Sequence, residues 1–172
     1  MSRSRSERPD GGASLVEFAL LAPLIFALLL GMLTGGLALS RKNSVENAVR
    51  EGARLGATLP DATTWAAAVQ TRVSEIADGD LGTDDICVEL ALTTGTAASP
   101  TESTQRATVC SLPAAAEPSS SDIPRNECIV KVWARTTSNF QVIFFSRALT
   151  LDGSSVSRFE RGSAPNCTPS TP

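Results

Sequence analysis

Glu17 is the residue whose position implies chemistry most directly, because its carboxylate lies where a long apolar segment has already begun. The run from Ala19 to Ser40 holds 22 residues and no charged one. As a helix rising about 1.5 Å per residue, this run can cross the roughly 30 Å of hydrocarbon in a bilayer. A carboxylate beside lipid is costly unless a cation pairs with it. The sequence therefore predicts a membrane helix and a partner for Glu17.

The peptide bond between Gly12 and Ala13 offers that partner. Cleavage there would leave a cationic α-amine on Ala13, which the Glu17 carboxylate of an axially staggered neighbouring helix would neutralise. The segment Gly-Ala-Ser-Leu-Val-Glu-Phe-Ala-Leu-Leu-Ala-Pro resembles the N-terminus of TadE-like pseudopilins of tight-adherence (Flp-type) type IV pili. In that family a Gly precedes the peptidase cut, Glu and an aromatic residue stand at positions five and six of the mature chain, and a Pro follows. The matching residues are Gly12, Glu17, Phe18 and Pro23.

This resemblance implies a minor pseudopilin that is cleaved after Gly12 by a prepilin peptidase and then assists or joins the pilus. The implied partners are the peptidase, other pilins or pseudopilins, the inner-membrane assembly platform and membrane lipid. The implied location is a single-pass cell membrane protein with a cytoplasmic N-terminus and an extracytoplasmic C-terminal domain. The alternatives are an uncleaved, membrane-anchored extracytoplasmic binding module and a secretory signal peptide, whose apolar core would be long for that class.

The apolar helix carries two features suited to assembly. Pro23 removes one backbone hydrogen bond and should bend the helix. Ala27, Gly31 and Gly35 recur every four residues and form a smooth ridge for a neighbouring helix, although small residues are also common in membrane helices generally. We therefore assign processing to Gly12, Ala13, Glu17 and Phe18, and subunit assembly to Glu17, Pro23, Gly31 and Gly35.

No breaker follows the apolar run, so one continuous helix is expected from about Ser14 to Leu59. Its second half has small and apolar residues at spacings of three and four, which indicates a packed face. The Gly-Ala-Arg at residues 52–54 resembles a TadE signature; packing on the chain's own domain is favoured over a subunit contact. The face comprises Val45, Ala48, Val49, Gly52, Leu55 and Gly56.

After Pro60, apolar residues from Trp65 to Ile76 predict an amphipathic helix that Gly79 ends. The acidic turn at 78–89 resembles a calcium loop but has Thr83 where that loop requires Gly, so a solvated turn is favoured. Period-two patterns then predict strands at 86–92, 105–110, 128–136 and 148–158, with a turn or short helix at 140–145 and a mobile loop at 111–125. The expected pairing is a meander.

Four cysteines, Cys87, Cys110, Cys128 and Cys167, all follow the membrane segment. None forms a Cys-x-x-Cys pair and the chain has no His, so zinc is not expected. An even number in a domain outside the cytoplasm indicates two disulfides. In a meander the pairings 87–110 and 128–167 are favoured among the three possible.

Composition excludes several other functions. The net charge of −3, with scattered basic residues, argues against a nucleic-acid partner. Without His, a serine or cysteine nucleophile has no imidazole base, and no Gly-rich phosphate loop follows a strand. We expect no enzyme activity, no cofactor and no metal.

The expected fold class is α+β: a long membrane-spanning N-terminal helix continues into a small domain with a second helix and an antiparallel sheet of about four strands. The expected divisions are a cytoplasmic leader at 1–12, the long helix at 13–59, the domain at 60–162 and a disordered tail at 163–172.

Overall fold

The computed structural model describes residues 11–60, 63–96, 99–108, 110, 112–113, 116–118, 126–142, 145–160 and 167. The expected leader and tail therefore lie outside the described residues, apart from Gly11, Gly12 and Cys167. The elements in chain order are α1 (Gly11–Thr58), α2 (Trp65–Ile76), the short 3-10 helix η1 (Thr83–Asp85), β1 (Ile86–Thr96), β2 (Ser99–Ala107), β3 (Cys128–Val142) and β4 (Phe145–Arg158).

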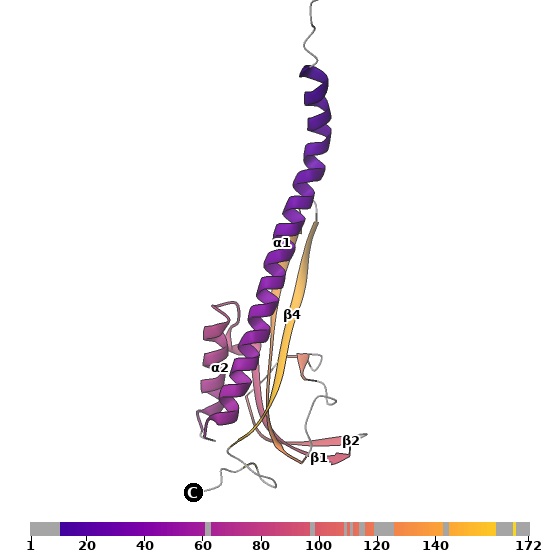
Figure 1. Cartoon of the computed structure of the whole chain (residues 1–172). Coiled ribbons are helices and arrows are strands. Elements are labelled where there is room, and N and C mark those ends of the chain that lie inside the picture. Colours follow the sequence, from indigo (N-terminus) through magenta and orange to yellow (C-terminus); the bar gives the residue numbers. More distant parts are fainter. Residues whose placement is uncertain are drawn as a thin grey trace, which may run out of the picture.

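The long helix α1 dominates the shape of the molecule. It runs without interruption from Gly11 to Thr58, passing through Pro23, and this confirms the single continuous helix expected from the sequence. Figure 1 shows its N-terminal half projecting away from the domain, while its C-terminal half lies against α2 and the sheet. One helix therefore belongs both to the apolar segment and to the folded core.

The antiparallel sheet has the strand order β2-β1-β3-β4. The expected meander is wrong, because β1 lies between β2 and β3 and pairs with both of them. Two predicted boundaries also need correction. The second strand is Ser99–Ala107, earlier than the predicted 105–110. In the segment 140–145, predicted as a turn or short helix, residues 140–142 belong to β3 and residue 145 to β4, and residues 143–144 lie outside the described residues.

The core lies between one face of this sheet and the two helices. Alternate residues of β1 and β3 point into it, as period-two strands require, and α1 and α2 contribute residues spaced three and four apart. Its members include Val45, Ala48, Val49, Ala53, Trp65, Val69, Val73, Val88, Leu90, Val130 and Val132. The packed face predicted for the second half of α1 thus lies on the chain's own domain.

Three glycines permit the close approach of these elements. A Cβ added to Gly52 would lie 2.2 Å from Val73 Cγ2, and one added to Gly56 would lie 3.0 Å from Val130 Cγ1. On β4, a Cβ at Gly153 would lie 2.8 Å from Val45 Cγ1. Any side chain at these positions would push α2 or the sheet away from α1.

The C-terminal end of α1 is capped from two sides. Trp65 Nε1 donates a 2.9 Å hydrogen bond to the Gly56 carbonyl, and the Glu160 amide donates a 3.0 Å bond to the Ala57 carbonyl. These carbonyls have no partner within the helix itself. Buried Phe159 follows β4 and reaches the same core. The helix end and the end of the sheet are thereby joined.

Both disulfides join segments across the sheet. Cys87 on β1 bonds to Cys110, and Cys128 at the start of β3 bonds to Cys167, which is the pairing that the sequence favoured. The first bond holds residues of the 110–118 segment over the outer face, where Ala116 is buried with Trp133. The described part of the expected mobile loop is therefore packed.

Candidate processing and assembly site

The N-terminal half of α1 is an uncovered apolar rod. Large hydrophobic side chains from Leu15 to Leu39 are exposed, with values such as 70% for Leu15, 63% for Phe18 and 71% for Met32. Among the described residues, α1 is the one helix long and apolar enough to cross a membrane. Water would penalise exposure of this continuous surface, so lipid or neighbouring helices must cover it.

The predicted processing residues lie at the start of this rod. α1 begins at Gly11, so the bond between Gly12 and Ala13 lies in its first turn. Gly12 is exposed, and a Cβ there would meet no atom within 4 Å.

Glu17 lies on the exposed surface one turn after Ala13. Among the described residues, it makes no hydrogen bond or ion pair. The structure therefore brings Gly12, Ala13, Glu17 and Phe18 together on one short stretch of helix, but it contains no second chain that would supply the partner amine. The role of Glu17 stays a prediction.

The predicted assembly ridge lies on a particular face of α1. Gly31 and Gly35 share this face with Val45 and Val49, because positions 14 residues apart are almost aligned on a helix. Both glycines are half-buried, and a Cβ at Gly31 would meet no atom within 4 Å. The ridge thus continues the stripe that packs on the sheet, and it is open at Gly31.

Basic residues mark the point where the apolar segment ends. The Arg41 guanidinium donates a 3.3 Å hydrogen bond to Ser138 Oγ on β3 and lies 3.8 Å from an Asp80 carboxylate oxygen. The Lys42 ammonium lies 3.7 Å from Glu46 on the next turn. The first charged side chains after the apolar segment thus contact Ser138 and Asp80 of the domain and Glu46 of α1.

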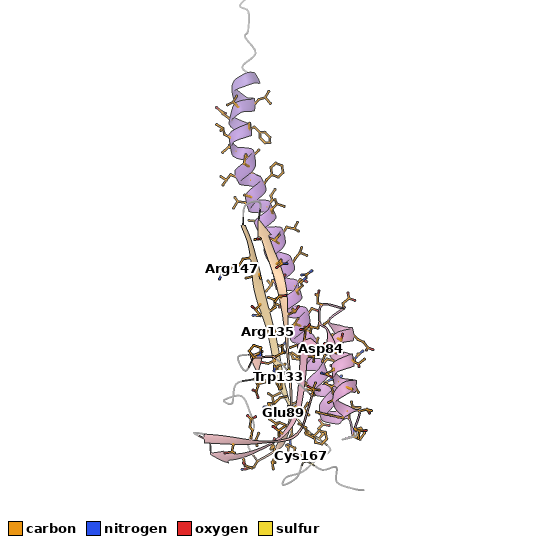
Figure 2. The ribbon with its side chains drawn as sticks, turned by 180° about the vertical axis from the view of Figure 1, so that it is seen from behind. Asp84, Glu89, Trp133, Arg135, Arg147 and Cys167 are labelled. Atoms are coloured by element: carbon orange, nitrogen blue, oxygen red, sulfur yellow. A yellow bond between two sulfur atoms is a disulfide. The ribbon has the colours of Figure 1, made fainter. Side chains whose placement is uncertain are left out.

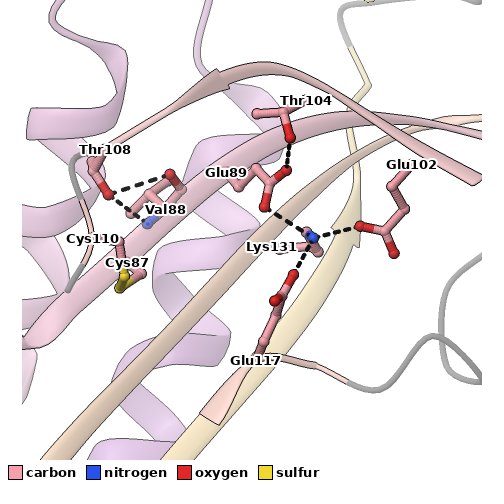
Figure 3. A network of polar contacts seen from close by, with 9 residues as sticks. All are labelled: Cys87, Val88, Glu89, Glu102, Thr104, Thr108, Cys110, Glu117 and Lys131. Atoms are coloured by element: carbon pink, nitrogen blue, oxygen red, sulfur yellow. Dashed lines mark hydrogen bonds and ion pairs between the residues drawn. A yellow bond between two sulfur atoms is a disulfide. The ribbon is translucent and has the colours of Figure 1, made fainter. Parts of the chain in front are cut away.

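The sequence did not predict a buried ion cluster on the outer face of the sheet (Figure 3). The Lys131 side chain on β3 is 1% exposed, and its ammonium lies 2.9 Å from Glu89, 2.6 Å from Glu102 and 2.6 Å from Glu117. Glu89 stands opposite Lys131 in the β1–β3 register, and it also accepts a hydrogen bond from Thr104. One ammonium therefore links β1, β2, β3 and the 116–118 segment.

The pKa of Lys131 reflects this environment. Burial lowers it, but hydrogen bonds to Glu102, Glu117 and Glu89 more than offset the burial, so the pKa is raised above its usual value. The lysine is thus firmly charged. A cluster that already contains its own cation has a structural explanation and needs no metal.

The acidic turn adopts a structure held by local bonds. Asp78 and Gly79 have positive φ angles of 53° and 81°, and Ser74 Oγ donates a 2.8 Å hydrogen bond to the Leu81 carbonyl. Thr136 Oγ1 on β3 donates to the Asp80 carbonyl at 3.0 Å. In the described part of the chain, no group of three or more His, Cys, Asp or Glu residues is placed to hold a metal ion.

Comparison with known proteins identifies the N-terminal part of the chain. Residues 12–54 match the family described as TadE-like protein, which is 43 of the 172 residues. No curated protein and no solved structure matches the chain. The matched range covers the candidate processing site, the exposed apolar rod and the first part of the packed face. It supports a minor-pilin-like role associated with a Tad pilus, in a family whose members are structural proteins.

Proposed function

We propose, from the premise that this chain is a TadE-like protein, that it is a prepilin-peptidase substrate cut between Gly12 and Ala13. The mature chain then acts in assembly of a tight-adherence pilus, or joins the pilus as a minor subunit. The observation that carries this proposal is the uncovered apolar half of α1, with Glu17 near its start. A helix of this kind is suited first to lipid and then to lateral packing against other pilin helices.

Charge determines the role proposed for Glu17. In the precursor, Ala13 has a neutral amide and the glutamate has no cation to pair with there. Cleavage creates the Ala13 ammonium, and a close ion pair between two subunits in a medium of low dielectric is much stronger than one in water. The pair would select one axial offset between neighbouring helices, since other offsets leave both charges unpaired in lipid.

Intact mass and N-terminal sequence of the membrane-extracted chain test the cleavage. Cells with the peptidase should yield a protein that starts Ala-Ser-Leu-Val, lighter by residues 1–12, and cells lacking the peptidase should yield the uncut chain. Gly12→Ala should leave uncut precursor, because a side chain obstructs the scissile bond. The control is Gly36→Ala, which places a methyl group in open space of the same helix.

The competing function is an uncleaved, membrane-anchored binding module. An N-terminus at Met1 or Ser2 in peptidase-positive cells would favour that function. Normal cleavage of Gly12→Ala would remove Gly12 from the recognition site. Pilus assembly in a strain that lacks the chain would count against the assembly role even if cleavage were found.

A further inference from the structure

The β3–β4 hairpin extends along α1 toward its N-terminus, beyond the other strands (Figures 1 and 2). Two contacts fix its axial position. Gly153 on β4 lies against Val45, and Ser138 on β3 bonds to Arg41. The paired strands then continue to Val142 opposite Phe145.

These contacts locate the end of the hairpin along the helix. Four residues from Ser138 to Val142 span about 13 Å, and eight from Gly153 to Phe145 span about 26 Å. At about 1.5 Å per helical residue, the end of the hairpin lies level with α1 somewhere between Leu28 and Met32. That level is well inside the uncharged run of 22 residues that ends at Ser40.

The length of α1 between Glu17 and the end of the hairpin is shorter than the thickness of the bilayer hydrocarbon. Between Glu17 and the end of the hairpin, α1 offers about 11–15 residues, or about 17–22 Å of helix. The hydrocarbon is about 30 Å thick, so the available length is some 10 Å short. Tilting α1 makes the shortage larger, because a tilted helix spans less depth per residue. Either the glutamate or the end of the hairpin must enter the hydrocarbon.

The chemistry of the two ends decides which one enters. Before cleavage supplies the Ala13 amine, the Glu17 carboxylate lacks this proposed partner, and an unpaired carboxylate in lipid costs several kcal/mol. By contrast, the sequence from Phe140 to Phe145 is Phe-Gln-Val-Ile-Phe-Phe, with five apolar residues and no charge. The first exposed charge on β4 is Arg147, two residues beyond Phe145 or about 7 Å away along the strand. A long basic side chain at that height reaches the lipid headgroups. Figure 2 shows Arg147 near the same end of the hairpin.

We propose that the end of the β3–β4 hairpin, Phe140–Val142 and Phe145, inserts into the bilayer leaflet on the side of the folded domain. Its depth is limited by backbone groups, because β3 and β4 both have free edges beyond the last β1 pair at Ala134, and unpaired groups are costly in hydrocarbon. Insertion of about 10 Å, comparable to that of interfacial segments, leaves Arg147 near the headgroups. The domain would therefore touch the membrane at two points, α1 and the hairpin.

Depth-dependent quenching tests this insertion in the full-length chain reconstituted into phosphatidylcholine vesicles. Phe145→Trp and, separately, Val142→Trp report on the hairpin end, and Thr150→Trp is the matched control on an exposed position lower on β4. The native Trp65 and Trp133 are buried in the domain, and the unaltered chain gives their background. Circular dichroism confirms that each variant is folded.

Lipids brominated along their acyl chains should clearly reduce the added emission of Phe145→Trp and Val142→Trp, because both side chains would lie among the acyl chains, and should leave Thr150→Trp unchanged. Equal emission of the hairpin variants in brominated and ordinary lipid would overturn the proposal. A third outcome is added tryptophan emission that is insensitive to brominated lipid but changes with the protein-to-lipid ratio. That outcome would place the hairpin end against a second copy of the chain, and it also overturns the proposal. The inference requires α1 to span the membrane and applies to the uncut chain, in which the Ala13 amine proposed as the partner of Glu17 does not yet exist.

Discussion

Gly52 on α1 and Val73 on α2 are so closely apposed that a Cβ atom at position 52 would lie 2.2 Å from Val73 Cγ2. Real side chains do not approach this closely, so the spacing of the two helices depends on the absence of a side chain at residue 52. Gly52 also lies inside the range that matches the TadE-like family. Its structural role in this chain is to let α2 pack onto α1.

Gly52→Ala should destabilise the domain by about 1–3 kcal/mol, because the added methyl group overpacks the contact. The measurement is reversible chemical unfolding of the full chain in detergent micelles. The double variant Gly52→Ala/Val73→Ala should lose less unfolding free energy than the sum of the two single variants. The shorter side chain at residue 73 makes room for the methyl group at residue 52, and that methyl group partly fills the space that Val73→Ala leaves. Gly36→Ala, in open space, is the control. A strictly additive double variant would contradict the proposed contact.

Lys131→Met should destabilise the domain by about 3–5 kcal/mol, because three carboxylates lose their shared cation while remaining partly buried. Lys42→Met, which removes an exposed lysine paired with Glu46, should change stability by less than about 1 kcal/mol. Equal effects of the two substitutions would contradict the importance of burial.

Alkaline pH provides an independent test of Lys131. Because the pKa of Lys131 is raised in the folded state, its ionic contribution is fully present below the unfolded value of about 10.4 and is lost as pH rises through the folded pKa. The free energy of unfolding should therefore fall above about pH 10 more steeply in the unaltered chain than in Lys131→Met. Parallel curves for the two proteins would show that other groups dominate the alkaline loss.

Glu17→Ala should still be cleaved after Gly12 and yet fail in pilus assembly, because the new Ala13 amine would have no carboxylate partner. The readouts are the N-terminal sequence of the mature chain and the amount of pilus on cells. Glu51→Ala removes a glutamate of the same helix outside the apolar half, where it pairs with Arg54, and serves as the control. Wild-type piliation with Glu17→Ala would reject the charge-pairing role.

The sequence predicted the helices well because their signals are local. The apolar run and the spacing of three and four in Val45, Val49, Val69 and Val73 are direct consequences of helical periodicity. The favoured disulfide pairs were obtained even though the meander was wrong. The reason is that Cys87 and Cys110 flank the β1–β2 hairpin in either arrangement.

The errors arose where strands form through their partners and not through their own sequence. Residues Ser99–Thr104 are polar and lack an apolar alternation, but they complete the ladder of β1. Phe140–Val142 extend β3 because β4 runs beside them. The Lys131 cluster was missed because its partners are distant in the sequence and one of them, Glu117, lies in an expected loop. A lysine within the apolar run Ile129–Trp133 was the available signal.

The uninterrupted course of α1 from the apolar segment into the core has a mechanical consequence. C-terminal to Pro23 the helix has no break, and its buried stripe is locked between α2 and the sheet by contacts such as Gly153 against Val45. The domain consequently has no joint at the membrane surface. A force or torque applied to the apolar half of α1, as when a subunit is drawn out of lipid, would therefore be transmitted directly to the sheet.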